Sequence, residues 1–183
     1  EVLVNLCIDF LENRTDKKTV DLCSGSGAIA VALDKISGAK VTAVEIDETA
    51  FSYLETNVKE NNSSVKPVMA DALEICETFA DGELNLIVSN PPYIKSADIE
   101  TLQKEVRLEP RLALDGGEDG CDFYREIVSR WSRKLKKGGA LAFELGENQA
   151  DAVKALMTDK GFSDFKISLD FGGVQRAIIG TLL

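Results

Sequence analysis

The residues with the clearest potential for chemistry are Ser89-Asn90-Pro91-Pro92-Tyr93, which follow the apolar run Leu84–Val88. Two consecutive prolines donate no backbone N–H and fix φ near about −65°, so the chain should leave the strand as a stiff, extended segment. The Asn90 side-chain oxygen and the Pro91 carbonyl could then accept hydrogen bonds from a flat, nitrogen-bearing group, with Tyr93 packed on its face. A Pro-Pro pair alone indicates only a turn that closes a strand. The choice between the two interpretations therefore depends on the rest of the chain.

A second group of residues follows the predicted strand Thr19–Cys23. Gly25-x-Gly27-x-x-Ala30 fits the glycine-rich turn of nucleotide-binding folds, in which Gly25 lets the backbone bend and Gly27 lets a ligand approach without meeting a Cβ. Glu45 lies twenty residues beyond Gly25, which is the spacing expected of an acid that binds ribose hydroxyls. The turn alone also fits a structural role, but together with Glu45 it favours an adenosine-type ligand.

Two cofactors satisfy this pattern, a nicotinamide dinucleotide and S-adenosylmethionine. The dinucleotide needs backbone N–H groups at a helix start for its pyrophosphate. Asp21, just before the glycines, suits an ammonium or a neighbouring N–H group and would repel a pyrophosphate if exposed. A buried Asp21 that caps its own loop is the alternative. The segment Asn90–Tyr93 favours S-adenosylmethionine, because a dehydrogenase has no use for it.

The composition narrows the possible functions. The chain has 183 residues, of which 44% are hydrophobic, which is typical of one globular domain. The formal net charge of −10 disfavours broad nucleic-acid binding, and no apolar run is long enough to span a membrane. The absence of histidine excludes Ser-His and Cys-His catalysis. Four widely spaced cysteines with no Cys-x-x-Cys pair argue against a disulfide framework or a zinc site and favour a reducing cytoplasm.

The elements that must position these residues alternate between strands and helices. We predict strands at Thr19–Cys23, Val41–Val44, Val65–Met69, Leu84–Ser89, Ala140–Leu145, Phe165–Leu169 and Arg176–Leu182. Apolar residues at helical spacing predict helices at 2–11, 28–33, 47–58, 121–135 and 150–159, with the fourth stopped by Gly138-Gly139. Residues 94–119 should form a polar loop with one short helical stretch from Ile99 to Val106.

The β-α alternation predicts an α/β fold over residues 1–183, with a mostly parallel sheet, helices on both faces and a C-terminal antiparallel hairpin. In such a sheet, ligands bind beyond the carboxyl ends of the strands. Four unusual features should meet at that edge: Asp21 to Gly27, Glu45, Asp71 and Asn90 to Tyr93.

The sequence resembles a known family in these motifs and in several that follow. Asp21–Gly27 resembles the first motif of class I S-adenosylmethionine-dependent methyltransferases, and Asn90–Tyr93 resembles the motif of those that methylate planar amides or exocyclic amines. The succession that narrows the match is Leu108–Leu114, Gly116–Gly120, Phe123-Tyr124, Glu144–Gly146 with Gln149, and Gln175-Arg176. It resembles the HemK/PrmC family, the protein-(glutamine-N5) methyltransferases of peptide chain release factors, over nearly the whole chain.

The resemblance implies a Rossmann-like class I methyltransferase fold with a seven-stranded sheet, and methyl transfer from S-adenosylmethionine to a release-factor glutamine. By resemblance, the backbone around Cys23 to Gly27 would hold the methionine end of the cofactor, Glu45 the ribose and Asp71-Ala72 the adenine. The implied cofactor-binding residues are Asp21, Cys23, Ser24, Gly25, Ser26, Gly27, Glu45, Asp71, Ala72 and Asn90. The implied catalytic segment is Asn90, Pro91, Pro92 and Tyr93, with Asn90 on the substrate amide.

The sequence departs from the family pattern in two places. Cys23 stands where the family often has glycine, and the family's small N-terminal helical domain, which helps to grip the release factor, is absent from residues 1–183. Two other functions fit some of the same residues. One is an adenine-N6 methyltransferase acting on DNA or RNA, and the other is a non-catalytic, partner-binding scaffold with the same fold.

Overall fold

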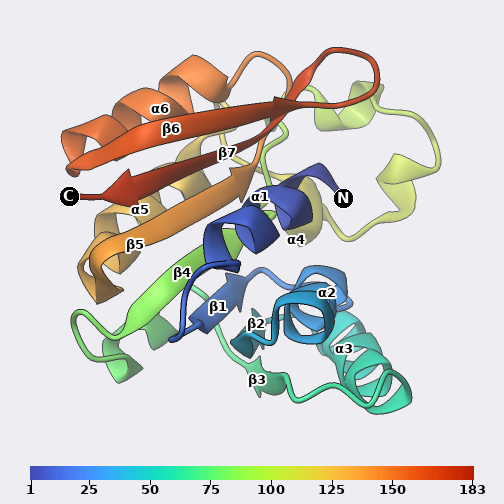
Figure 1. The fold of residues 1–183 in the computed structure, drawn as a ribbon. Coiled ribbons are helices and arrows are strands. Elements are labelled where there is room, and N and C mark those ends of the chain that lie inside the picture. The colour runs from blue at the N-terminus through green and yellow to red at the C-terminus, as the bar shows by residue number, and fades with distance from the viewer.

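The computed structural model describes residues 1–183 as a seven-stranded sheet with helices on both faces (Figure 1). The strand order is β3-β2-β1-β4-β5-β7-β6. The pairs from β3 to β5 are parallel, and β7 is antiparallel to both of its neighbours. The strands are β1 Lys18–Leu22, β2 Lys40–Glu45, β3 Lys66–Met69, β4 Leu84–Ser89, β5 Leu135–Glu144, β6 Phe162–Leu169 and β7 Gln175–Leu182. The predicted α/β fold with a closing hairpin is confirmed.

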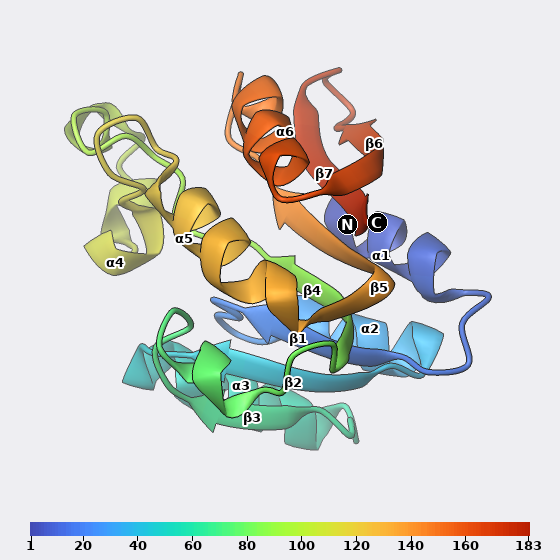
Figure 2. The ribbon, with the colours of Figure 1, turned by 90° about the vertical axis from the view of Figure 1, so that its left-hand side faces the viewer.

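Six α-helices connect or cover these strands: α1 Val2–Leu11, α2 Ala28–Ser37, α3 Glu48–Glu60, α4 Arg111–Leu114, α5 Asp122–Trp131 and α6 Ala150–Asp159. Figure 2 shows α5 and α6 on one side of the sheet and α1 and α2 on the other. No helix here combines the length and hydropathy that a membrane span requires.

The sheet is buried on both faces, and alternate residues of its central strands enter different cores. Leu141 and Phe143 of β5 belong to the core beneath α5 and α6, while Ala140 and Ala142 belong to the core beneath α1, α2 and α3. Since side chains alternate between the faces of a strand, one strand supplies both cores. The large side chains of Tyr124 and Trp131 fill the α5 side, and the alanines leave room for α1 on the other.

The boundary between α5 and the fifth strand differs from the prediction. The predicted helix over 121–135 ends at Trp131, a short 3₁₀ turn covers Ser132–Lys134, and β5 begins at Leu135 rather than at Ala140. The pairing with β4 shifts between Leu84↔Leu135 and Leu86↔Ala140, so Gly138-Gly139 lies in a bulge within the strand. A Cβ at Gly139 would lie 2.8 Å from the Lys136 carbonyl oxygen, which is why glycine is needed there. The glycine pair bends a strand and does not separate it from a helix.

The remaining differences lie in the loops and at strand ends. The single helical stretch predicted within residues 94–119 is instead two 3₁₀ turns, Ile99–Thr101 and Val106–Leu108, followed by α4. Strand β6 begins at Phe162, three residues earlier than predicted, and another 3₁₀ turn covers Ile75–Thr78.

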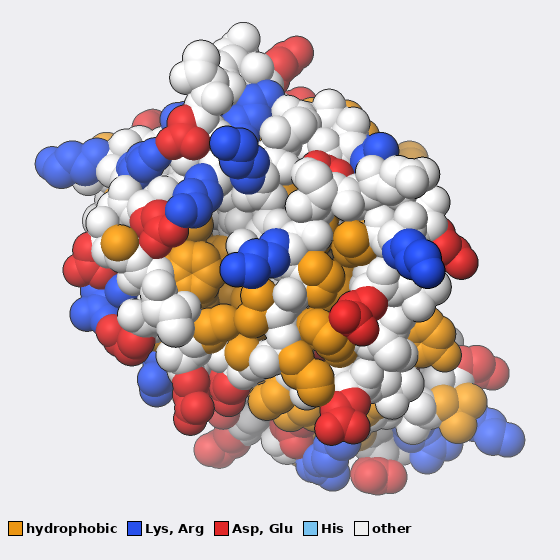
Figure 3. All heavy atoms as spheres, turned by 90° about the horizontal axis from the view of Figure 1, so that it is seen from below, with side chains coloured by type: hydrophobic (Ala, Val, Ile, Leu, Met, Phe, Trp, Pro, Cys, Tyr) orange, Lys and Arg blue, Asp and Glu red, His pale blue; other side chains and the backbone are white.

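Short edge strand β3 lies at the bottom of Figure 1, and Figure 3 views the molecule from that side. Hydrophobic side chains gather near the centre of this face, with charged side chains beside and around them (Figure 3). Lys66 and Pro67 occupy the first half of the four-residue strand. Proline and lysine on a short edge strand disfavour pairing with a further strand from another chain.

The order in which successive strands are added to the sheet reverses between β1 and β4. These strands are neighbours, paired as Leu22↔Ser89, while the chain reaches β2 and β3 on one side of β1 and β5 on the far side of β4. The Ser89 hydroxyl donates a hydrogen bond to the Leu22 carbonyl oxygen at 2.8 Å, which joins the two strand ends. Such a switch point leaves a crevice at the carboxyl ends of the strands, and Cys23 and Asn90 begin the two loops that leave it.

Candidate active site

The loop between β1 and α2 contains three residues in the left-handed region. They are Cys23 with φ 56°, Gly25 with φ 54° and Gly27 with φ 80°. Because Cys23 carries a Cβ, its conformation is strained where glycine would not be. A Cβ at Gly27 would lie 2.3 Å from the Leu54 Cδ1 atom, so this glycine permits close packing against α3. The position that a Cβ would take at Gly27 is therefore occupied by Leu54, while the role of the Gly27 backbone toward a ligand stays a prediction.

Asp21 lies beneath the same loop and is completely buried. Its Oδ2 atom accepts a hydrogen bond from the Ala30 backbone N–H in the first turn of α2, at 3.1 Å. Burial, and to a smaller extent the nearby Glu45 carboxylate, raises the pKa of Asp21 to about 8. Of the two roles considered for Asp21, the structure therefore shows the buried loop cap. The Asp21 side chain is not part of the cavity lining.

Glu45 occupies the end of β2 and is held by three backbone N–H groups. Its Oε2 atom accepts from Gly25 at 2.7 Å, and its Oε1 atom accepts from Ile46 and Asp47, each at 2.9 Å. Asp47 in turn accepts from the Ala50 N–H at 2.8 Å and caps α3, as predicted. Since Oε1 already accepts two hydrogen bonds and Oε2 only one, the Oε2 atom retains capacity to accept a hydroxyl donor.

Asp71 and Ala72 follow β3 and form another wall. The Asp71 Oδ1 atom accepts from the Leu73 N–H at 2.7 Å, which closes a tight turn. The Trp131 indole N–H donates to the Ala72 carbonyl oxygen at 2.8 Å, so a buried residue of α5 fixes this wall from behind.

Asn90 to Tyr93 leave β4 as the predicted stiff segment. Asn90 is exposed, Pro91 and Pro92 are buried, and Tyr93 is half-buried. No backbone N–H donates to the Pro91 carbonyl. The Tyr93 hydroxyl donates to the Glu144 Oε1 atom at 3.2 Å, and burial raises the pKa of Tyr93 to about 12. Asn90 and the Pro91 carbonyl thus have no hydrogen-bond partner within the protein, while Tyr93 is a neutral side chain.

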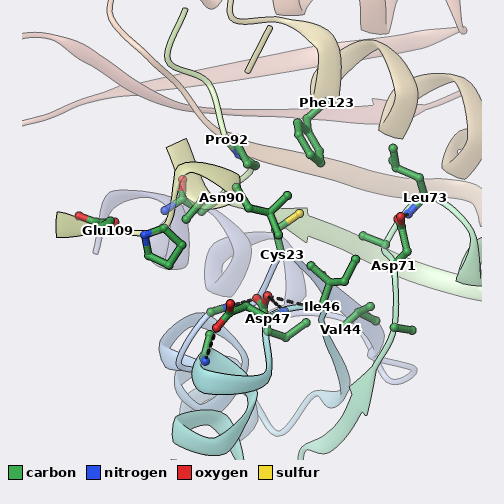
Figure 4. Close-up of a pocket in the computed structure, with 18 residues that line it drawn as sticks. Cys23, Val44, Ile46, Asp47, Asp71, Leu73, Asn90, Pro92, Glu109 and Phe123 are labelled. Carbon is green, nitrogen blue, oxygen red and sulfur yellow. Dashed lines mark hydrogen bonds between the residues drawn. The ribbon is translucent and has the colours of Figure 1, made fainter. Parts of the chain in front are cut away.

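A cavity of about 380 Å³ joins these residues. Cys23, Gly25, Glu45, Asp71, Ala72, Asn90 and Pro92 line it. In Figure 4, Asn90 and Asp71 lie at opposite sides of the cavity, with Cys23 between them. The predicted site residues outside its lining are Asp21, Ser24, Ser26, Gly27, Pro91 and Tyr93. Ser26 is exposed and accepts a hydrogen bond from the Asn57 side chain through its carbonyl.

The cavity suits an adenosyl ligand in size and chemistry. Its volume lies within the range of small-molecule sites, roughly 300–1,000 Å³. A Cβ added at Gly25 would meet no protein atom within 4 Å, so it would project into open space that a ligand can use. Burial raises the pKa of Cys23 to about 12, so this lining residue is a neutral thiol. No group of acidic or cysteine side chains is arranged to hold a metal ion.

Several lining residues were not among the predicted site residues. Val44, Ile46, Ala70 and Leu73 are immediate neighbours of predicted residues, so proximity along the chain could have identified them, while Asp47 and Ala50 lie at the start of α3. Glu109 and Pro110 directly precede α4, Leu112 and Ala113 lie in α4, and Phe123 comes from α5. The sequence signal for this outer wall was the resemblance over Leu108–Leu114 and Phe123-Tyr124.

Comparisons with known proteins agree with this geometry. The model of the family described as "Methyltransferase small domain" matches residues 4–111. The release factor glutamine methyltransferase of Bordetella pertussis is 34% identical over 183 residues, covering 100% of this chain and 67% of the relative. The chain belongs to the release factor glutamine methyltransferase family.

Other members of this family extend beyond the aligned region. The Clostridium acetobutylicum member is 35% identical over 98% of this chain and 64% of its own length. The Geobacter sulfurreducens member is 42% identical, over 89% of this chain and 57% of its own length. The chain thus spans between about half and two thirds of the length of the curated relatives that it matches.

Solved structures confirm the class I methyltransferase fold. A Pyrococcus furiosus methyltransferase matches with a TM-score of 0.70 at 22% identity, over 97% of this chain and 82% of that chain. The catalytic domain of hMettl16, solved with a MAT2A 3′UTR hairpin, matches with a TM-score of 0.74 at 16% identity. The match covers 98% of this chain and 69% of that chain. At these identities the likeness concerns the fold alone.

Proposed function

We propose that this chain transfers a methyl group from S-adenosylmethionine to the side-chain amide nitrogen of a glutamine in a protein. The substrate we propose is the Gly-Gly-Gln glutamine of a peptide chain release factor. The observation that carries the proposal is one continuous cavity that has Glu45 and Asp71 in its walls and Asn90 and Pro92 beside them. The names of the aligned family members support the choice of a release factor. A substrate from translation termination is consistent with the predicted cytoplasmic location.

In this proposal, different segments of the cavity wall bind different parts of the cofactor. Glu45 would accept hydrogen bonds from the ribose hydroxyls, because its carboxylate is already oriented by three N–H groups. Asp71 and Ala72 would bind the adenine, and the backbone from Cys23 to Gly27 the methionine end. When bound, S-adenosylmethionine supplies a methyl group already activated by its sulfonium.

Asn90 and Pro91 would prepare the substrate nitrogen. An amide nitrogen is a poor nucleophile because its lone pair is delocalised into the carbonyl. If the Asn90 Oδ1 atom and the Pro91 carbonyl accept its two N–H bonds, they stabilise positive charge developing on nitrogen and orient its lone pair. Tyr93 would hold the approaching side chain, so that alignment supplies much of the rate enhancement.

No side chain is needed as a base in this scheme. Hydrogen bonds to two fixed acceptors loosen the N–H bonds, and the proton leaves after methyl transfer. Asn90 is exposed, so water can reach the nitrogen that releases the proton. Tyr93 stays protonated because burial raises its pKa to about 12.

A methylation assay tests this proposal. Purified chain is incubated with methyl-labelled S-adenosylmethionine and a release-factor fragment that contains Gly-Gly-Gln, beside the same fragment with Gly-Gly-Ala and a DNA duplex. We expect label only in the Gly-Gly-Gln fragment, at the glutamine side chain. Label in DNA would support the adenine-N6 alternative, which the net charge of −10 disfavours. No label in any substrate, with S-adenosylmethionine bound, would favour the non-catalytic scaffold.

A further inference from the structure

Gln149, immediately before α6, uses its whole amide group in hydrogen bonds. Its Nε2 atom donates to the Tyr93 carbonyl at 3.0 Å and to the Gly120 carbonyl at 3.2 Å. Its Oε1 atom accepts from the Gly146 backbone N–H at 3.0 Å and lies 3.2 Å from the Tyr124 hydroxyl, whose single proton it shares with the Glu144 carbonyl oxygen at 2.8 Å. Both donors and the acceptor of the amide are therefore satisfied by four different residues. The cavity lining does not include Gln149.

The backbones around this amide approach too closely for any side chain to intervene. A Cβ at Gly120 would lie 2.5 Å from the Tyr93 carbonyl oxygen and 2.6 Å from the Gln149 Nε2 atom. At Gly146 it would lie 2.5 Å from the Gln149 Oε1 atom, and at Gly116 it would lie 2.7 Å from the Tyr93 Cα atom. Three glycines thus let separate segments pack directly around Tyr93 and Gln149. The interactions come from parts of the chain far apart in sequence.

Tyr93 is consequently fixed at two points. The Glu144 carboxylate accepts from its hydroxyl, and the Gln149 amide donates to its carbonyl. We propose that Gln149 is a positioning residue for methyl transfer: by holding the Tyr93 carbonyl, it fixes the direction in which Asn90 and the Pro91 carbonyl face the substrate. This inference rests on the proposed function of Asn90–Tyr93. It explains why a residue outside the cavity has its amide completely engaged.

A positioning role and a merely structural role lead to different results on substitution. Loss of general stability would lower the amount of folded protein and affect cofactor binding together with turnover. Loss of positioning lowers kcat in the folded protein and leaves the Kd for S-adenosylmethionine unchanged, because Gln149 lies outside the cavity lining and its amide makes no hydrogen bond to Cys23, Gly25, Glu45 or Asp71. Two variants separate the effects.

Gln149→Met retains the length of the side chain and removes all four hydrogen bonds. Gln149→Glu retains the acceptor and turns a carboxylate oxygen toward two carbonyls. The matched controls are Gln103→Met and Gln103→Glu, since Gln103 is exposed and contacts neither Tyr93 nor Gly120. For folded Gln149 variants we expect kcat on the Gly-Gly-Gln fragment to fall by roughly 10- to 10²-fold, the scale of a reacting group displaced by about 1 Å. The controls should match the parent.

The pH profile supplies a readout that general destabilisation does not move. Protonation of the introduced carboxyl group in the Gln149→Glu variant restores one donor for the Tyr93 carbonyl. We therefore expect the ratio of variant to parent kcat to rise as the pH falls, whereas the ratio for Gln149→Met stays constant. A parallel fall of the two ratios on acidification would contradict the inference.

Deuterium uptake of the peptide Asn90–Ser96 tests the positioning without any assay of activity. Uptake should increase in Gln149→Met and stay unchanged in Gln103→Met. Parent kcat in both Gln149 variants, an equal loss of kcat and cofactor affinity, or unchanged uptake would each overturn the inference. If the parent itself methylates no glutamine, the proposed function fails, and the uptake measurement still decides whether Gln149 holds this segment.

Discussion

Two halves of one cavity are built in different ways. The proposed cofactor half is lined by Cys23, Gly25, Glu45–Asp47 and Asp71–Leu73. The proposed substrate half is lined by Asn90, Pro92, Glu109, Pro110, Leu112 and Ala113, and Tyr93 adjoins it outside the lining. In the cofactor half, Glu45 organises its surroundings by accepting from Gly25, Ile46 and Asp47. These partners lie within twenty residues of Glu45 along the chain.

The substrate half depends on longer connections. Gln149 lies 56 residues from Tyr93, and Glu144 lies 51 residues from it. The segment from Ile94 to Asp115 is also closed at its base, where the Ile94 N–H donates to the Leu114 carbonyl and the Gly116 N–H donates to the Ile94 carbonyl. The loops around Glu45 are thus held by residues near in sequence, whereas Tyr93 is held by the end of β5 and by the residue before α6. The two halves should respond separately to substitution.

The largest expected effect is on turnover in the substrate half. Asn90→Ala removes an acceptor proposed to act on the nitrogen that is methylated, so kcat should fall by roughly 10²-fold or more. The Kd for S-adenosylmethionine should change much less. Steady-state assays with the Gly-Gly-Gln fragment and calorimetric titration measure the two quantities. Asn5→Ala, at an exposed position of α1, is the control, and equal turnover in Asn90→Ala and parent would remove Asn90 from the mechanism.

The next effect is on cofactor affinity in the other half. Glu45→Ala removes the proposed partner of the ribose hydroxyls and the acceptor that holds the Gly25 N–H. Hydrogen bonds to a charged group contribute about 1.5–3 kcal/mol, so the Kd should rise by roughly 10- to 10²-fold. Calorimetric titration against the exposed control Glu60→Ala checks this result. An unchanged Kd would show that Glu45 serves only the loop.

A pH effect on stability should come from Asp21, behind the cofactor half. Its folded pKa of about 8 lies above the unfolded value of about 3.9, so its contribution to stability is fully present below about pH 4 and is lost as the pH rises through about 8. Asp21→Asn keeps an acceptor for the Ala30 N–H and removes this titration. At pH 9 the variant should melt several degrees above the parent, since 1 kcal/mol corresponds to about 2–4 °C in a domain of this size.

Thermal melts of both proteins from pH 5 to pH 9 measure this difference. The gap between their melting temperatures should widen with rising pH. A constant gap would mean that Asp21 does not titrate in this range.

The smallest expected effect is on the free energy of unfolding, from substitutions at Cys23, where φ is 56° and the backbone is strained. Glycine tolerates this conformation, whereas a β-branched residue does not. Cys23→Val should therefore lower the free energy of unfolding by about 1–2 kcal/mol more than Cys23→Gly. Urea denaturation of the two variants tests the order. The reverse order would show that packing of the side chain outweighs the backbone strain.

Local patterns in the sequence were sufficient to predict much of this arrangement. Apolar runs and turn residues predicted the βα order, and Asp47 was correctly expected to cap α3. The rule that ligands bind at the carboxyl ends of parallel strands correctly brought Glu45, Asp71 and Asn90 to one edge of the sheet. These predictions succeed because strand and helix periodicity, caps and prolines act over a few residues.

The predictions that failed depended on partners distant in sequence. Gly138-Gly139 forms a bulge against β4 instead of ending a helix, and the side of Gly27 where a Cβ would lie packs against Leu54 of α3. A glycine permits several backbone conformations, and only the neighbouring element decides which one is used.

By itself, the sequence determined the class of fold, the stiff segment Asn90–Tyr93 and the acid at the end of β2, because each follows from the chemistry of adjacent residues. Only the tertiary structure decided that Asp21 is a buried cap, that Glu109–Ala113 closes the cavity and that Gln149 holds Tyr93. Burial, cavity walls and long-range hydrogen bonds exist only once distant segments have packed, so no local pattern encodes them.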